Sequence, residues 1–166
     1  MALPKNLKNL LHHRTIIWLA LTAYAIAIAV MCFTPQPKLF DSIHTPNIIM
    51  WGRLRLLLIP FNTIVSMTKA VSLFELFWFT LQNVMNMLLL FPLVFLLHFL
   101  TDKWHGYRKS FVLGLFISLT IEVTQLLLDL AIDANRVFEI DDIWTNALGA
   151  LIAYFVYRYV KMKFVR

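Results

Sequence analysis

Carboxyl and amide side chains recur at helical spacing inside three apolar stretches of the chain. The pairs, each three or four residues apart, are Asn83 and Asn86, Glu122 and Gln125, and Asp142 and Asn146. Residues at these spacings share one face of a helix. Such a face can hydrogen-bond a polar ligand, and its carboxyl groups can also transfer protons as general acids or bases. The candidates for proton transfer are Glu122 and Asp142.

Glu122 carries the only formal charge between residues 111 and 128. A carboxyl group in apolar surroundings needs a cation, several hydrogen-bond donors or a bound proton. Arg136, on the loop that follows, could supply the positive charge, either in a binding site or in a purely structural ion pair. The amides also have a structural alternative, because Asn and Gln often form hydrogen bonds between transmembrane helices.

The segment 136–142 is dense in charge and contains Arg136, Glu139, Asp141 and Asp142. Asp141 or Asp142 at the start of a helix would interact favourably with the helix dipole. Together with Glu122, these carboxylates could ligate a divalent cation through oxygen. Their spacing matches no known metal-binding loop, so we predict no metal site. No motif elsewhere indicates a cofactor, a phosphate-binding loop or a catalytic triad.

Four apolar runs must position these side chains. They span residues 15–33, 76–100, 111–128 and 142–158. A helix needs about 20 apolar residues to cross a hydrocarbon core of about 30 Å. The composition agrees, since 60% of the residues are apolar and only 14% are charged, against about a half and a quarter in soluble domains. We therefore predict an all-α membrane protein with about four transmembrane helices in a single domain, residues 1–166.

The first run could be a signal peptide, because basic residues precede it. It is long for that role and no cleavage region follows it, so we expect an uncleaved span. The segment 48–64 is apolar but interrupted by Arg53, Arg55 and Pro60. It is too broken for a comfortable span, and we expect an interfacial or re-entrant segment there. An ordinary connecting helix is the alternative.

Basic residues predict the direction of the spans, because they gather on the cytoplasmic side. With the N-terminus inside, the inner segments contain Lys5, Lys8, Arg14, Lys103, Arg108, Lys109, Arg158, Lys161, Lys163 and Arg166. The outer segments contain Lys38, Arg53, Arg55, Lys69 and Arg136. We therefore expect both termini in the cytoplasm. This arrangement accounts for the net charge of +6 without nucleic-acid binding, which the sequence does not favour.

In this topology the polar pairs lie at similar heights, toward the outer end of their helices. We expect them to meet in a pocket that opens toward the outer surface. The expected ligand-binding residues are Asn86, Glu122, Gln125, Arg136, Asp141, Asp142 and Asn146.

At these residues the sequence resembles the VanZ-like family of bacterial membrane proteins. The matching parts are Asn86 with Pro92 after it, the pair Glu122 and Gln125, and the segment 136–149 with Arg136, Ile140, Asp141, Asp142, Asn146 and Gly149. Two positions depart from the family pattern. Glu139 stands where the family usually has Asp, and Val94 stands where Gly is common.

The resemblance implies a bacterial plasma-membrane protein with a role in the cell envelope. The family's namesake is associated with low-level resistance to teicoplanin, and no settled reaction comes with the fold. Our leading hypothesis is a pocket that binds a membrane-lipid headgroup, a lipid-linked wall intermediate or a lipoglycopeptide. The alternatives are an enzyme that acts on an envelope lipid, with Glu122 or Asp142 as acid or base, and a structural or assembly partner. The sequence does not indicate an oligomeric state.

Overall fold

The computed structural model describes residues 5–36, 47–69 and 73–164. Four long helices dominate it: α1 (Lys5–Phe33), α3 (Leu73–Leu100), α4 (Tyr107–Ile132) and α5 (Ile140–Phe164). The predicted four-helix fold is confirmed, and each helix extends beyond its predicted span. Stretches long and apolar enough to cross a membrane lie at His13–Phe33, Leu76–Leu100 and Tyr107–Ile132. Among the basic residues of the topology prediction, Lys38 and Arg166 lie outside the described residues.

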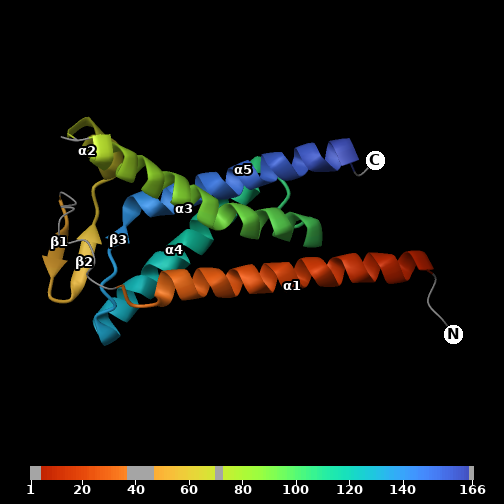
Figure 1. The fold of residues 1–166 in the computed structure, drawn as a ribbon, viewed down its shortest axis with the longest axis horizontal. Helices are drawn as coiled ribbons and strands as arrows, with labels where there is room; N and C mark the ends of the chain where they lie inside the picture. Colours follow the sequence, from red (N-terminus) through yellow and green to blue (C-terminus); the bar gives the residue numbers. More distant parts are fainter. Residues whose placement is uncertain (1–4, 37–46, 70–72, 165–166) are drawn as a thin grey trace.

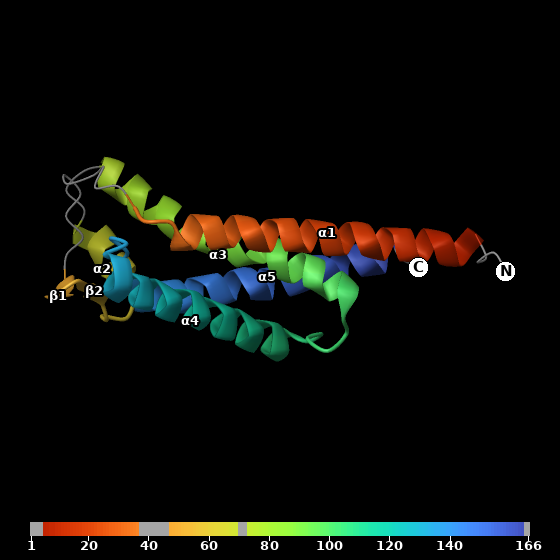
Figure 2. The ribbon, with the colours of Figure 1, turned by 90° about the horizontal axis from the view of Figure 1, so that it is seen from below.

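The fourth helix, α5, is less apolar because other helices surround much of it. It packs mainly against α3 and α4 and lies between them (Figure 2). Ala147, Ala150 and Ala153 are fully buried at 0% exposure. Small residues let helix backbones approach closely where lipid supplies no hydrophobic driving force. At Gly149 the approach is closest, because an added Cβ would overlap the Met87 carbonyl group of α3.

The two ends of the molecule differ in structure. The start of α1 and the end of α5 lie at one end, and a small sheet lies at the other (Figure 1). Toward the sheet end α1 and α3 diverge (Figure 1), while nearer their middle Tyr24 Oη of α1 donates to the Leu89 carbonyl of α3 at 3.1 Å. The two helices therefore lie close together near their middle and separate toward the sheet (Figure 1).

Two strands of a three-stranded sheet and a short helix occupy the long first loop. β1 (Ile49–Trp51) pairs antiparallel with β2 (Leu54–Leu57), and β2 pairs parallel with β3 (Phe138–Glu139), just before α5. The short helix α2 (Asn62–Lys69) follows. The expected interfacial or re-entrant segment thus contains a hairpin that the sequence analysis did not predict. The connecting-helix alternative describes only its last part. Local pattern did not indicate the hairpin because β2 finds its second partner about 80 residues away.

Candidate functional site

A cavity of about 450 Å³ lies near the sheet end, with residues of all four long helices in its wall. Its lining residues are Met31, Cys32, Gln36, Trp78, Gln82, Met85, Asn86, Leu89, Ile121, Glu122, Gln125, Arg136, Val137, Glu139, Asp142 and Asn146. Six of the seven residues expected to bind a ligand are among them, and Asp141 is not. The structure therefore brings Asn86 of α3 together with the polar pairs of α4 and α5 around one space. Asn83, the other member of the α3 pair, is not in the wall and donates to the Phe79 carbonyl of its own helix at 3.1 Å.

Glu122 is a buried residue of the cavity wall. Its side chain on α4 is only 2% exposed, and Oε2 accepts a hydrogen bond from the Glu139 backbone N–H at 3.1 Å. This contact fixes β3 against α4 just before α5 begins. The described residues show no ion pair between Glu122 and Arg136, so the expected positive partner lies in the same cavity wall but binds elsewhere.

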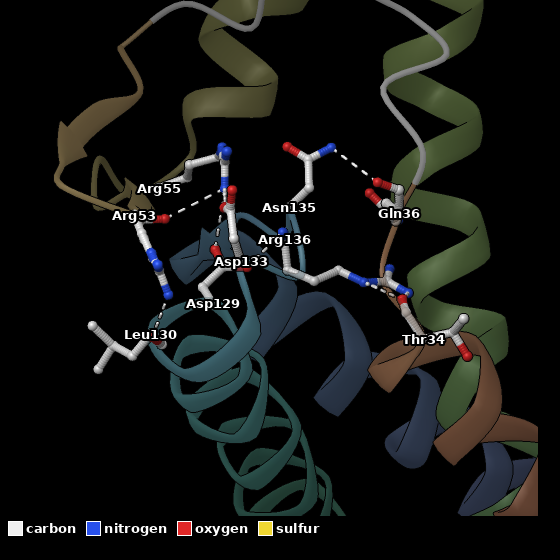
Figure 3. A network of polar contacts seen from close by, with 9 residues as sticks. All are labelled: Thr34, Gln36, Arg53, Arg55, Asp129, Leu130, Asp133, Asn135 and Arg136. Atoms are coloured by element: carbon white, nitrogen blue, oxygen red, sulfur yellow. Dashed lines mark hydrogen bonds and ion pairs between the residues drawn. The ribbon is translucent and has the colours of Figure 1, made fainter.

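Arg136 attaches the loop after α4 to the end of α1. Its Nε and Nη2 donate to the Thr34 carbonyl at 3.2 and 2.7 Å, and Nη2 also donates to the Met31 carbonyl (Figure 3). Carbonyl groups at a helix C-terminus have no intrahelical donor and carry partial negative charge. The guanidinium satisfies these carbonyls, so it forms no direct ion pair with Glu122, although its positive charge remains in the same cavity wall.

Asp129 connects the same loop to the sheet. Its Oδ1 accepts the Arg136 backbone N–H at 2.9 Å, and Oδ2 lies 3.6 Å from Nη1 of Arg55 on β2. The same Nη1 lies 3.2 Å from Oδ1 of Asp133, which ends α4 in a left-handed conformation (Figure 3). The sheet, the end of α4 and the end of α1 are thus held by one polar network beside the cavity.

Three further hydrogen bonds connect the polar residues of α3, α4 and α5. Asn86 Nδ2 donates to Asp142 Oδ1, which joins α3 to the start of α5. Asn146 Nδ2 donates to Ser118 Oγ at 2.8 Å, and that hydroxyl donates to the Asp142 carbonyl at 3.1 Å. These bonds join different helices, which is the structural role that the sequence analysis gave as the alternative to ligand binding. They also hold Asp142 at the cavity.

Asp141 has a different position from its neighbour. It is 1% exposed, and its Oδ1 accepts the Phe61 backbone N–H at 2.6 Å and the Trp144 Nε1–H at 3.1 Å. The side chain therefore joins the turn after β2 to the first turn of α5. Consecutive residues on a helix point about 100° apart, so only one of the two aspartates faces the cavity.

Four polar lining residues were not among the expected site residues, namely Cys32, Gln36, Gln82 and Glu139. Gln82 precedes Asn86 by one helical turn, so the spacing rule that selected Asn86 also applies to it. Its Nε2 donates to both carboxyl oxygens of Glu139 at 3.3 Å. Glu139 reaches the cavity because β3 aims it there, and Cys32 lies at the end of α1. The charge-dense segment 136–142 contains Glu139, whereas no local pattern marks Cys32 or Gln36.

Burial raises the pKa of Glu139, which lies outside the helices, from 4.5 to about 7. The hydrogen bond from Gln82 lowers this pKa, and the nearby Asp141 carboxyl raises it. Glu139 is therefore a group whose charge changes near neutral pH.

Protein stability is expected to decrease between mildly acidic and neutral pH because of Glu139. The folded-state pKa of about 7 exceeds the ordinary value of 4.5, so the folded state holds the proton more tightly. The resulting loss of stability begins near pH 4.5 and is complete above about pH 7, and it amounts to on the order of 3 kcal/mol. Thermal unfolding of the purified protein in detergent, followed from pH 5 to pH 8, should show a falling Tm and a shallower slope for Glu139→Gln. Equal slopes for the two proteins would refute this assignment.

Four helices around a polar cavity, three with apolar stretches long enough to cross a bilayer, define a multi-pass helical membrane protein. The chain matches the VanZ/LLP1 family over residues 21–162. This match covers most of its length, so the protein belongs to that family, and the resemblance carried by the segment 136–149 is confirmed. No curated protein matches the chain significantly, and no solved structure does.

Proposed function

We propose that the cavity binds the polar head of a lipid-linked molecule of the cell envelope. The observation that carries this proposal is the composition of the cavity wall. Carboxyl and amide groups of α3, α4 and α5 line it together with Met31 of α1 and Met85 of α3, which are 58% and 49% exposed. A headgroup would bind among the polar residues, and an acyl chain would leave between α1 and α3 along apolar surface.

The orientation that supports this function places the cavity on the outer side of the plasma membrane. Lys and Arg are more frequent in the segments near the start of α1 and the end of α5 than near the sheet. These two ends lie together, opposite the cavity and the sheet (Figure 1). The positive-inside rule then places both termini in the cytoplasm and the cavity outside.

Membrane lipids, lipid-linked wall intermediates and lipoglycopeptides share a polar head and an acyl chain. A protein that binds the acylated drug teicoplanin, or its lipid-linked target, would reduce the drug's effect. Vancomycin has no acyl chain and would be affected less. The resistance associated with the family's namesake is therefore a property that this cavity could provide.

Selective protection against teicoplanin is the expected result in a sensitive Gram-positive host. The wild-type protein should raise the inhibitory concentration of teicoplanin but not that of vancomycin. Glu122→Gln and Asp142→Asn, at matched membrane levels, should return teicoplanin susceptibility to that of the empty vector, because each removes a carboxylate from the cavity. Asp102→Asn is the matched control, since it removes an 89% exposed carboxylate at the other end of α3.

Two results would contradict parts of this proposal. If the wild type gives no protection, teicoplanin resistance would be excluded as a function of this protein. Protection by Glu122→Gln equal to that by the wild type would show that the cavity is not involved.

A further inference from the structure

The amide groups of the cavity wall direct N–H donors toward protein acceptors. Gln82 donates to the Glu139 carboxyl, Asn86 to the Asp142 carboxyl, Gln125 to the Cys32 carbonyl at 3.0 Å, and Asn146 to Ser118 Oγ. These bonds engage amide N–H donors with protein acceptors, while the carboxyl groups of the same wall add further acceptor oxygens.

Asn146 is the amide residue of the wall that most needs a further hydrogen-bond donor. The residue lines the cavity and is 2% exposed, and within the described residues its Oδ1 has no hydrogen-bond partner. A buried acceptor without a donor costs free energy, and such groups are rare in native proteins. A donor supplied by a bound molecule would satisfy it.

The charged residues of the wall also favour a ligand that donates hydrogen bonds. Three carboxyl groups line the cavity, from Glu122, Glu139 and Asp142. Arg136 is the one basic residue among the cavity's described lining residues, so three carboxyl groups share the wall with a single guanidinium. One guanidinium cannot balance three ionised carboxyl groups, so a further cation would be favoured in this partly closed space over an anion.

We propose that the chemical group recognised in this cavity is a primary ammonium, carried by the polar head of the bound molecule. This inference rests on the proposed function and names the ligand chemistry of the same site. An ammonium group offers three N–H donors and a positive charge. It therefore matches both the unsatisfied Asn146 oxygen and the surrounding carboxyl groups. Phosphoethanolamine heads and amine-bearing wall intermediates both present this group.

The test compares lipids whose headgroups carry a primary ammonium, a quaternary ammonium or no amine. Purified full-length protein in detergent is titrated with dihexanoyl phosphatidylethanolamine, phosphatidylcholine or phosphatidylglycerol, and the rise in Tm is recorded. Free ethanolamine and MgCl₂ are added in separate arms. The ethanolamine lipid should bind about tenfold or more tightly than the glycerol lipid, a difference of ~1.4 kcal/mol. The choline lipid should bind weakly because its quaternary nitrogen has no N–H donor.

Variants connect that selectivity to the cavity. Glu122→Gln keeps an oxygen to accept the Glu139 N–H, so it should fold, and it should weaken binding of the ethanolamine lipid about tenfold. Asn146→Ala is the second variant and should weaken the same binding. Asp102→Asn should bind the ethanolamine lipid as the wild type does. If free ethanolamine raises the Tm as much as the ethanolamine lipid does, the cavity still binds an ammonium group. Its ligand would then be a soluble amine and not a lipid.

The remaining outcomes separate failure of this inference from failure of the proposed function. Equal binding of the three lipids, or preference for the glycerol lipid, with both cavity variants impaired, would retain a headgroup site and overturn the ammonium assignment. Stabilisation by MgCl₂ alone that Glu122→Gln abolishes would overturn it in favour of a metal ion. No binding of any lipid would overturn both the inference and the proposed function.

Discussion

Replacing Gly149 by alanine is expected to lower the stability of the protein by about 3 kcal/mol or more, at the upper end of the cost of overpacking. The added Cβ would overlap the Met87 carbonyl group of α3. A backbone carbonyl inside a helix cannot rotate away, so α3 and α5 must move apart. Thermal unfolding and the fraction of monodisperse protein in detergent measure the effect.

Function should fall together with stability in this variant. Met87 follows Asn86, whose amide binds Asp142 on α5. Separation of the two helices would therefore break this contact and widen the cavity. Ile152→Ala is the control, because Ile152 lies on the same helix but is 44% exposed, and it should change the Tm little. A Tm for Gly149→Ala equal to that of the wild type would show that the close helix contact is not required.

Replacing Arg136 by alanine is expected to release the end of α1 from the cavity wall. The variant loses the hydrogen bonds to the Thr34 and Met31 carbonyls. Hydrogen bonds to charged groups contribute ~1.5–3 kcal/mol each, so we expect destabilisation of about 2–3 kcal/mol and loss of ligand binding. Arg136→Lys should recover only part of the lost stability and binding, because an ammonium group lacks the planar set of donors that reaches both carbonyls.

Hydrogen exchange gives a local measurement for this variant. Amide protons in residues 29–34 should exchange faster in Arg136→Ala than in the wild type. The matched control is Arg53→Ala, because Nη1 of Arg53 donates to the Leu130 carbonyl at the end of α4, at 3.3 Å, and not to α1 in the part of the chain that the structure describes (Figure 3). This control should leave exchange at the end of α1 unchanged. Equal effects of the two substitutions would mean that Arg136 is not the anchor of α1.

Much of the candidate site was predictable because its parts are local in the sequence. Glu122 and Gln125 share a helix face whatever surrounds them, and so do Asp142 and Asn146. An ionisable group inside an apolar run also requires polar neighbours, which made a meeting of these faces expected. The same spacing rule extends to Gln82, which was visible in the sequence but not selected.

The partners of the charged residues were not predictable in this way. Arg136 is close to Glu122 in the sequence but binds the end of α1, about 100 residues away. Asp141 is next to Asp142 but faces the turn after β2 instead of the cavity. Which acceptor a side chain reaches depends on how helix ends and loops pack, and residue type does not encode that.

Composition and helical spacing predict that this protein lies in a membrane and consists of long helices. Long apolar runs favour a bilayer, where a helix is the structure that satisfies its own backbone hydrogen bonds. Three features appear only in the folded molecule: the sheet that joins the first loop to β3, the central position of α5, and the close contact between Gly149 and Met87. Hydropathy and helical spacing act within a few turns, whereas strand pairing and helix packing join segments tens of residues apart, so no local pattern predicts these features.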